Sequence, residues 1–266
     1  MKLKSAFMAT ITLLTLASCA TSPLGRSQMM MMPDNQLNTA GAQSFATYKQ
    51  KLPIEKDSTI NRYVRCIADA ILTAANLPAS QWEVVVFRDD SANAFAVPGN
   101  KIGVHTGLID ISENQNQLSA VIGHEVSHVL AKHSNERASQ GFALKQGLGI
   151  AQQLLLGGNK ANSGTNQMLM SALGLGAQFG VMLPFSRIHE SEADEHGLYL
   201  MSAAGFDPKE SVRLWQNMSK GGAKQPEFLS THPSGQTRIS RLNQAMPRAM
   251  RNYNQAQTSG KKPRCG

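Results

Sequence analysis

The sequence "GHEVSHV" at residues 123–129 places one carboxylate and two imidazoles inside an otherwise apolar run. On a helix, at about 100° per residue, Glu125 falls in the middle of an apolar stripe. His124 and His128 lie together along one border of that stripe. Its apolar members are Leu118, Val121, Ile122 and Val129. Because burying an unpaired carboxylate costs several kcal/mol, the pattern predicts a helix whose inward polar groups have a function.

A metal site would explain this arrangement. Imidazoles four residues apart project from adjacent turns of a helix, and both can reach one Zn²⁺ at about 2.0–2.1 Å. Glu125 lies too far round the helix to bind the same ion, but it can act as a general base toward water. The alternative is a chance match on a helix with two satisfied histidines. A third ligand would favour the site, and we expect one Zn²⁺ per chain.

The nearest further histidine, His133, does not qualify as that ligand. It lies nine residues beyond His124, which is about 180° around a continuous helix, so we expect a surface side chain. The metzincin pattern would require a Gly and a His where this chain has Ala131 and Ser134. The third ligand is therefore expected elsewhere in the sequence.

The segment "SRIHESEADEHGLYLMSAAG" at residues 186–205 provides better candidates. On a helix, Glu190 and Asp194 share a face with small and apolar residues, and that face can pack closely on the first helix. Glu190 is the expected third ligand, and Asp194 can accept the free N–H of a ligating histidine. Glu192 is the alternative ligand, disfavoured because it shares a charged face with Glu195 and Tyr199.

Three motifs, "AVIGHEVSHVLAKH", "SRIHESEAD" and "THPSGQTRI", occur in this order. Together they resemble the gluzincin metallopeptidase family of HtpX and the CAAX prenyl proteases, and within it the periplasmic lipoprotein and chaperone-protease branch. The resemblance covers roughly residues 50 to 250. It implies a zinc endopeptidase acting on misfolded or misassembled envelope proteins. It also makes His124, His128 and Glu190 the ligands, Glu125 the base and Asp194 the residue that orients a ligand.

The same resemblance gives a meaning to two further segments. The strand pair beginning at residue 93 would hold an extended polypeptide by β-augmentation, although a plain hairpin is equally compatible with the sequence. Its expected substrate-binding residues are Asn93, Ala94, Phe95 and Ala96. In "THPSGQTRI", His232 could stabilise an oxyanion or occupy the open zinc position and keep the enzyme latent. Arg238 is expected to support the site or to form a structural ion pair in a capped loop.

The N-terminus is typical of an exported lipoprotein. Residues 1–18 combine a short basic start with an apolar stretch too brief to be a permanent anchor, and "LASC" ends at Cys19. We expect lipidation of Cys19, and Ala20 after it favours the outer membrane with the protein facing the periplasm. The alternative is an ordinary secretory signal with a chance cysteine. Residues 19–45 are expected to form a flexible tether to the membrane.

Charge and cysteine content bound the remaining possibilities. From Arg238 onward there are seven basic and no acidic residues, but almost no aromatic side chains, which argues against a nucleic-acid partner. We expect residues 253–266 to be a basic tail that follows the peptidase domain at residues 46–252. Cys66 and Cys265 could form a disulfide in an oxidising compartment, or remain unpaired. Oligomeric state is not predicted.

The coarse pattern predicts a mostly α domain with a small β-sheet, an α+β zincin-type fold with the H-E-x-x-H helix packed on the E-x-x-A-D helix. An uncharged segment between Lys160 and Arg187 favours a buried or interfacial helical hairpin over a membrane-dipping helix. Two other functions stay open, namely a non-catalytic assembly lipoprotein with a structural zinc and a zinc amidase acting on the cell wall. The expected helices and strands span residues 58–75, 82–89, 93–109, 113–138, 140–156, 167–181, 187–204, 208–220 and 236–249.

Overall fold

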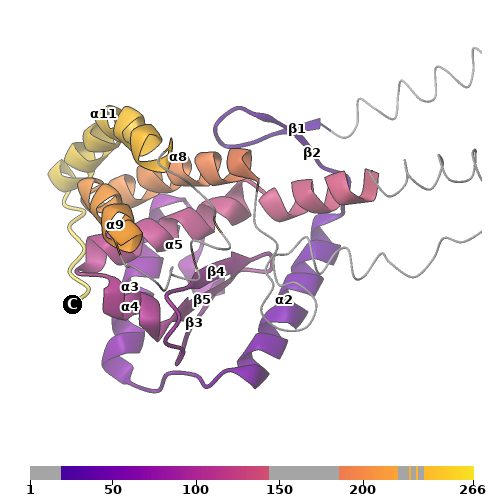
Figure 1. Cartoon of the computed structure of the whole chain (residues 1–266), viewed down its shortest axis with the longest axis horizontal. Coiled ribbons are helices and arrows are strands. Elements are labelled where there is room, and N and C mark those ends of the chain that lie inside the picture. The colour runs from indigo at the N-terminus through magenta and orange to yellow at the C-terminus, as the bar shows by residue number, and fades with distance from the viewer. Residues whose placement is uncertain (1–18, 144–185, 221–227, 229–231, 233–236) are drawn as a thin grey trace, which may run out of the picture.

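The computed structural model describes residues 19–143, 186–220, 228, 232 and 237–266, in which helices surround a small sheet (Figure 1). This confirms the predicted mostly helical fold with a small sheet. The main apolar core lies between the helices and one face of the sheet. The helices are α2 (Asp34–Lys51), α3 (Ser58–Ala74), η1 (Ala79–Gln81), α4 (Thr106–Ile111), α5 (Gln115–Leu130), α8 (Arg187–Ala204), α9 (Lys209–Lys220) and α11 (Thr237–Thr258).

Side-chain caps define where three of these helices begin. The Asp57 carboxylate accepts hydrogen bonds from two backbone N–H groups at the start of α3, and the Asn114 side chain does the same for α5. Ser186 accepts one such bond at the start of α8. These caps satisfy N–H groups that have no partner within the helix. α8 ends at Gly205, whose φ of 96° is the left-handed conformation that favours glycine at this position.

The sheet places one strand beside α5. β3 (Glu83–Phe87) and β4 (Ala94–Val97) both pair with the central strand β5 (Lys101–His105), in parallel and antiparallel fashion respectively. Side chains alternate between the two faces, so Ile102 and Val104 join the main core while Phe87 and Phe95 face α2. β4 is thus an edge strand of this sheet, with α5 alongside it.

The prediction of a flexible tether at residues 19–45 is wrong. β1 (Cys19–Thr21) and β2 (Ser27–Met29) form a hairpin, and α2 follows it. Phe45 is buried against Phe87 and Phe95, and Tyr48 of the same helix packs edge-on against both rings. Aromatic packing on the outer face of the sheet therefore makes this segment part of the domain.

The long helix predicted for residues 113–138 is interrupted. α5 ends at Leu130, and Lys132 adopts a φ of 50° before a second helical stretch begins at His133. The Lys132 N–H still bonds to the Val129 carbonyl, as in a helix-terminating turn. The chain changes direction here, so positions after Lys132 do not continue the face pattern of α5.

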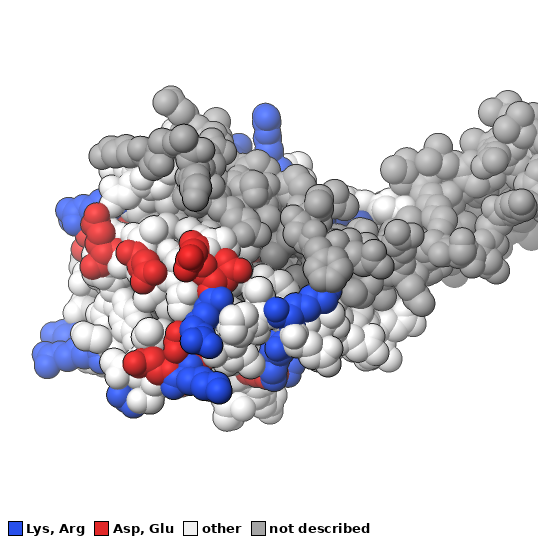
Figure 2. Space-filling view, turned by 60° about the horizontal axis from the view of Figure 1, so that its bottom comes forward, with Lys and Arg blue, Asp and Glu red and all other residues white. Residues whose placement is uncertain are grey.

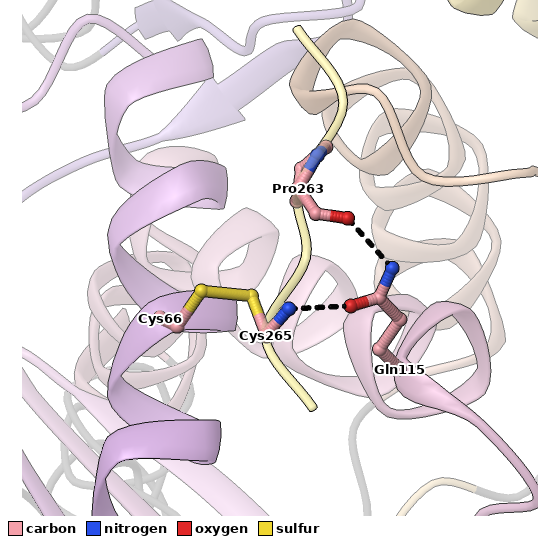
Figure 3. The surroundings of a disulfide bond; sticks show 4 residues. All are labelled: Cys66, Gln115, Pro263 and Cys265. Atoms are coloured by element: carbon pink, nitrogen blue, oxygen red, sulfur yellow. Dashed lines mark hydrogen bonds between the residues drawn. A yellow bond between two sulfur atoms is a disulfide. The ribbon is translucent and has the colours of Figure 1, made fainter.

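The C-terminal segment is not a separate tail. α11 runs to Thr258, across the predicted boundary between residues 252 and 253. Cys66 of α3 and Cys265 form a disulfide with their Cα atoms 5.5 Å apart (Figure 3). Beside it, the Gln115 side chain donates to the Pro263 carbonyl and accepts from the Cys265 N–H, both at 2.8 Å. The last residues are thereby held against the first turn of α5.

Several predictions concern residues outside the described part of the chain, namely the signal at 1–18, most of the helix at 140–156, the helix at 167–181 and the uncharged segment at 160–187. Within the described part, no helix combines the length and the apolar character required to cross a membrane. On the face shown in Figure 2, the described basic side chains lie among acidic ones and do not form a separate patch.

The two helices that carry the predicted site cross at close range through glycine. A Cβ atom built on Gly197 of α8 would lie 2.8 Å from the His124 nitrogen and 2.9 Å from the Gly123 carbonyl carbon, both backbone atoms of α5. Real Cβ contacts are not this short, so a side chain at position 197 would push the helices apart. The crossing therefore depends on glycine at this position.

We expect Gly197→Ala to lower the free energy of unfolding by about 1–3 kcal/mol, the usual effect of overpacking. Zinc affinity should fall as well, because the helices that carry the ligands separate. Urea denaturation and metal titration would measure both effects, with Ser191→Ala on the same helix as control because the Ser191 hydroxyl donates to the Arg187 carbonyl of α8 itself. Wild-type stability and zinc affinity in Gly197→Ala would show that the crossing tolerates a methyl group.

Candidate metal centre

Four buried side chains converge at the crossing of α5 and α8. His124 and His128 come from α5, and Glu190 comes from α8. His232 lies between α9 and α11 in the sequence. One ligand atom from each lies within 4.8 Å of all the others. All four side chains are at most 3% exposed. The described residues thus contain a group of donors able to hold one metal ion.

The distances between the donor groups are close to those of a tetrahedral zinc site. Ligand atoms about 2.0–2.1 Å from a tetrahedral ion lie about 3.3–3.4 Å from one another. Here His124 Nε2 lies 3.0 Å from His128 Nε2 and 3.2 Å from His232 Nδ1. The Glu190 carboxylate lies 2.9 Å from His232 Nδ1 and 3.4 Å from each of the other two Nε2 atoms. Three nitrogens and one oxygen in this arrangement fit Zn²⁺.

Glu125 lies at the edge of this cluster and is buried. Its Oε2 accepts a hydrogen bond from the Ala96 N–H at 3.2 Å, which directs the carboxylate between α5 and β4. Its Oε1 has no hydrogen-bond partner among the described residues, and lies 3.4 Å from His232 Nε2. Burial raises the pKa of Glu125. A buried carboxylate with one free oxygen is well suited to accept a proton.

Asp194 and Arg238 lie on the far side of the ligands. Asp194 Oδ1 lies 3.0 Å from His124 Nδ1, the ring nitrogen that faces away from the donor cluster. Arg238 donates from Nε to Asp194 at 2.7 Å and from Nη2 to Glu190 at 2.8 Å. Its guanidinium lies 3.9 Å from the centre of the Trp215 ring. One arginine thus fixes the positions of both carboxylates of α8.

The charges of the cluster favour a cation. Burial opposes protonation of His124, but Asp194 and Glu190 raise its pKa to about 9. Burial would also raise the pKa of Glu190, but His232 and His124 hold it well below its usual range. Arg238 contacts two of the three buried carboxylates and supplies one positive charge. A cation bound at His124 Nε2 would take the place of the proton that these carboxylates favour on the ring.

Comparison with known proteins agrees with this geometry. Residues 58–246 match the model of Peptidase family M48. The chain belongs to peptidase family M48. It is 33% identical over 190 residues to the mitochondrial metalloendopeptidase OMA1 of Schizosaccharomyces pombe. The aligned region covers 70% of this chain and 53% of that protein. It is 26% identical over 245 residues to the beta-barrel assembly-enhancing protease of Escherichia coli K12, covering 89% of this chain and 48% of that protein.

This M48 chain therefore spans about half the length of these curated relatives. Family membership, the names of the relatives and the donor cluster together support a zinc metallopeptidase. Of the predicted site residues, the structure brings together His124, His128, Glu190, Glu125 and His232 in one buried cluster. It also places Asp194 and Arg238 in direct contact with members of that cluster.

The prediction that His133 lies on the surface is wrong. The side chain is fully buried, and its Nδ1 lies 2.9 Å from Nδ1 of His128. The prediction assumed a continuous helix, whereas the break at Lys132 turns His133 back toward the site. Glu192, expected on a charged face, is buried too and contacts His133 Nε2 at 3.1 Å, outside the donor cluster. No local sequence signal marks this pairing.

The predicted substrate strand is only partly placed for that role. Ala94 and Phe95 are buried, and Phe95 points into the aromatic cluster with Phe45. Asn93 is buried as well, with no hydrogen-bond partner for its side-chain amide among the described residues. Ala96 contacts the site through the N–H that it donates to Glu125. The backbone of β4 therefore lies next to the site, and most of its side chains face elsewhere.

A second group of charges lies behind the donor cluster. Arg26 of the N-terminal hairpin donates two hydrogen bonds to Glu136, at 2.7 and 2.6 Å. Burial would raise the pKa of Glu136, but Arg26 and Gln28 lower it from 4.5 to about 2. A carboxyl whose pKa is lowered by folding stabilises the folded state above its unfolded pKa. That contribution is lost as pH falls from about 4.5 toward 2.

We expect the free energy of unfolding of the metal-free protein to fall between pH 5 and 2.5 less steeply in Glu136→Gln than in wild type, since the variant has no carboxyl to protonate there. Urea denaturation at half-unit pH steps would measure the two slopes. Above pH 5.5 the variant should be the less stable of the two, since it lacks the charged partner of Arg26. Parallel curves for both proteins would show that Glu136 does not contribute to acid sensitivity.

Proposed function

We propose that this chain is a zinc-dependent metalloendopeptidase that hydrolyses peptide bonds in misfolded or misassembled envelope proteins. The observation that carries the proposal is the buried cluster of His124, His128 and Glu190 with the free Glu125 oxygen at its edge. Membership of a peptidase family supports the reaction class. The substrate class rests on the sequence resemblance, and one relative is named a beta-barrel assembly-enhancing protease.

In this proposal His124, His128 and Glu190 hold the zinc ion. When bound, the ion lowers the pKa of a water molecule toward about 7 and polarises the scissile carbonyl. Glu125 takes a proton from the attacking water on its free Oε1 and later delivers it to the leaving amine. The Ala96 N–H holds the other oxygen of Glu125, so the carboxylate keeps its direction during both transfers. Burial raises the pKa of Glu125, which strengthens the carboxylate as a proton acceptor for the first transfer.

His232 has two candidate roles: to occupy the open zinc position and keep the enzyme latent, or to stabilise the oxyanion. The distances support the first role for the arrangement seen here. Its Nδ1 completes the tetrahedral donor set, which is where water or substrate would have to enter. Phe228 stacks on the His232 ring with centroids 4.4 Å apart, and the backbone N–H of His232 donates to the backbone carbonyl of Phe228. Catalysis then requires His232 to leave this position, after which the same imidazole could contact an oxyanion.

Asp194 and Arg238 are proposed to position the ligands. Asp194 Oδ1 lies 3.0 Å from His124 Nδ1, where it would accept the Nδ1 hydrogen once Nε2 binds the ion. Arg238 holds Asp194 and Glu190 in a fixed relation. The edge of β4 is proposed to bind the substrate backbone as an added strand, and Ala96 would bring that backbone close to Glu125.

Localisation is also a proposal. We infer that residues 1–18 are removed and that Cys19, the first residue of β1, is lipidated and attaches the protein to the outer membrane, facing the periplasm. The support comes from the "LASC" sequence. Incorporation of labelled palmitate, absent in Cys19→Ala, would test this anchor.

The experiment that tests the function compares two substrates. The purified chain is incubated with casein and, separately, with peptidoglycan, before and after zinc removal with a chelator. A metalloendopeptidase cleaves casein, stops when zinc is removed and recovers when zinc returns. Release of peptidoglycan fragments alone would identify a cell-wall amidase. No cleavage of either substrate, with zinc bound, would indicate a non-catalytic assembly protein with a structural zinc. The free oxygen of Glu125 argues against that last role, since a structural site requires no base.

A further inference from the structure

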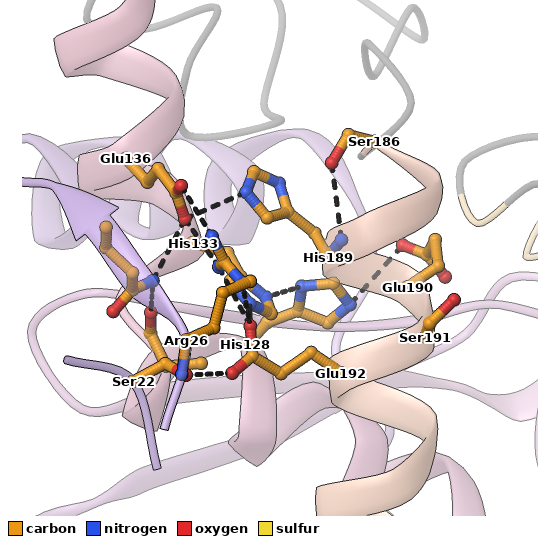
Figure 4. Close-up of polar contacts among 12 residues, drawn as sticks. Ser22, Arg26, His128, His133, Glu136, Ser186, His189, Glu190, Ser191 and Glu192 are labelled. Atoms are coloured by element: carbon orange, nitrogen blue, oxygen red, sulfur yellow. Dashed lines mark hydrogen bonds and ion pairs between the residues drawn. The ribbon is translucent and has the colours of Figure 1, made fainter. Parts of the chain in front are cut away.

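A compact group of polar residues lies behind His128, between the N-terminal hairpin and the helices (Figure 4). Two imidazoles, His133 and His189, stack with ring centroids 4.4 Å apart, and each contacts its own carboxylate. His133 Nε2 lies 3.1 Å from Glu192 Oε2, and His189 Nε2 lies 3.0 Å from Glu136 Oε2. The four side chains are all buried. These four side chains are neither proposed zinc ligands nor proposed catalytic groups.

The two pairs differ in one respect that matters for the metal centre. His133 Nδ1 lies 2.9 Å from Nδ1 of His128, whose Nε2 is part of the donor set. When Nε2 of an imidazole binds a metal, its Nδ1 carries a hydrogen and requires an acceptor. His133 Nδ1 is in position to be that acceptor. Glu136 and His189 reach the donor set less directly, since His189 stacks on the ring of His133.

The tautomers of His128 and His133 depend on each other. His133 accepts on Nδ1 from His128, so in its neutral form the ring hydrogen is on Nε2. That Nε2–H donates to Glu192. A carboxylate at this end stabilises the hydrogen on Nε2 and keeps Nδ1 free as an acceptor. The order Glu192, His133, His128 is therefore a continuous line of hydrogen bonds that ends at the metal centre.

The N-terminal hairpin holds the outer end of this line. Arg26 donates from Nε to Glu192 Oε2 at 2.8 Å, and the Ser22 hydroxyl donates to the other carboxylate oxygen. The same guanidinium binds Glu136, so both carboxylates share one cation. Glu192 thus has a defined position although its partners in the hairpin are 166 and 170 residues away in the sequence.

We propose that Glu192 and His133 are positioning residues for the zinc ligand His128, and that the hairpin containing Ser22 and Arg26 holds them in place. This inference rests on the proposed zinc site. Each histidine ligand of α5 would then be positioned by a carboxylate. Asp194 lies directly beside His124, whereas Glu192 acts on His128 through the imidazole of His133. Both residues are buried behind His128, so their expected effect is on the affinity and the orientation of the ion.

Zinc affinity of variants tests the proposal without an activity assay. The chain is stripped of metal, and its zinc dissociation constant is measured by competition with a chromogenic chelator. We expect His133→Phe, which keeps the ring shape but has no acceptor, to weaken zinc binding by about 10- to 100-fold. Glu192→Gln should weaken it by several-fold to about 10-fold, because a neutral amide is a weaker acceptor for His133 than a carboxylate.

Glu136→Gln is the matched control. It removes a carboxylate that binds the same Arg26 and an equivalent imidazole, so its loss of folding stability should be similar to that of Glu192→Gln. It should change the zinc dissociation constant by less than twofold. The melting temperature of each protein is measured with and without zinc, because a purely structural residue changes both values equally. A positioning residue reduces the increase that zinc produces.

The outcomes separate the alternatives. Weaker zinc binding in His133→Phe and Glu192→Gln, but not in Glu136→Gln, supports the proposal. Equal zinc affinities for the two Glu→Gln variants would overturn it and leave both pairs as parts of the core. If His133→Phe does not fold, His133→Asn replaces it, since its amide oxygen can accept from His128 and should retain part of the affinity. Absence of zinc binding in wild type would refute the proposed function itself, a result distinct from equal variants.

Discussion

Replacing Glu125 by Gln should lower kcat for peptide cleavage by about 10²- to 10⁴-fold, the usual contribution of a general base. The amide keeps the size of the carboxylate and can still accept the Ala96 hydrogen bond on its oxygen. It cannot take a proton from water. Zinc content should stay at one ion per chain, because Glu125 is not among the four converging donors. Thermal stability should be equal or higher, since a buried carboxylate costs more to remove from water than a neutral amide of the same size.

The measurement pairs initial rates of casein cleavage with metal analysis of the same samples. Glu195→Gln is the control, because Glu195 lies on α8 but bonds to Tyr199 and not to the donor cluster. This control should cleave at the wild-type rate. A Glu125→Gln protein that loses zinc would show that Glu125 is a structural part of the site. One that keeps both zinc and full activity would exclude Glu125 as the base.

Removing the disulfide by replacing Cys66 and Cys265 with Ser should lower the free energy of unfolding by about 5 kcal/mol if chain entropy dominates. The bridge joins residues 199 positions apart, so it closes a long loop in the unfolded chain. Its loss should also release the C-terminal residues from Gln115 at the first turn of α5. For a domain of this size we expect the melting temperature to fall by about 10–20 °C.

Scanning calorimetry of the double variant and of reduced wild type would measure this effect. The two samples should agree, because both lack the bond and neither loses a fully buried side chain at position 66. Single Cys→Ser variants serve as a further control for intermolecular pairing through the remaining thiol. A fall of less than about 3 °C in reduced wild type would mean that the unfolded chain retains structure or that the C-terminal segment contributes little to stability.

The features of α5 that define its chemistry are local, and this is why they could be predicted. His124 and His128 are one turn apart, so the geometry of any helix brings their rings together. Glu125 stands out because an apolar stripe surrounds it in the sequence. The same holds for Glu190 and Asp194 on α8. Once these two helices are identified, their inward polar groups indicate a shared partner without knowledge of how the helices cross.

Positions beyond the helix break could not be predicted in this way. Lys132 has a left-handed φ although no Gly or Pro marks the turn, so periodicity alone continues α5 through His133. Periodicity therefore places His133 on the surface, although it contacts the predicted zinc ligand His128. The N-terminal hairpin was missed for a related reason. Its polar residues resemble a tether until Arg26 is seen to bind Glu136 and Glu192.

The sequence by itself determined α3, α5 and α8, the inward acids and histidines that mark the site on α5 and α8, and the strands of the small sheet, because each of these depends on residues close together in the sequence. Only the tertiary structure decided that His232 joins the donor set, that Arg238 binds both carboxylates of α8, and that the hairpin closes over Glu192. Those contacts join segments more than 40 residues apart. Their formation depends on where the chain turns between helices and on how closely glycine lets two backbones approach, and neither is encoded in a periodic pattern.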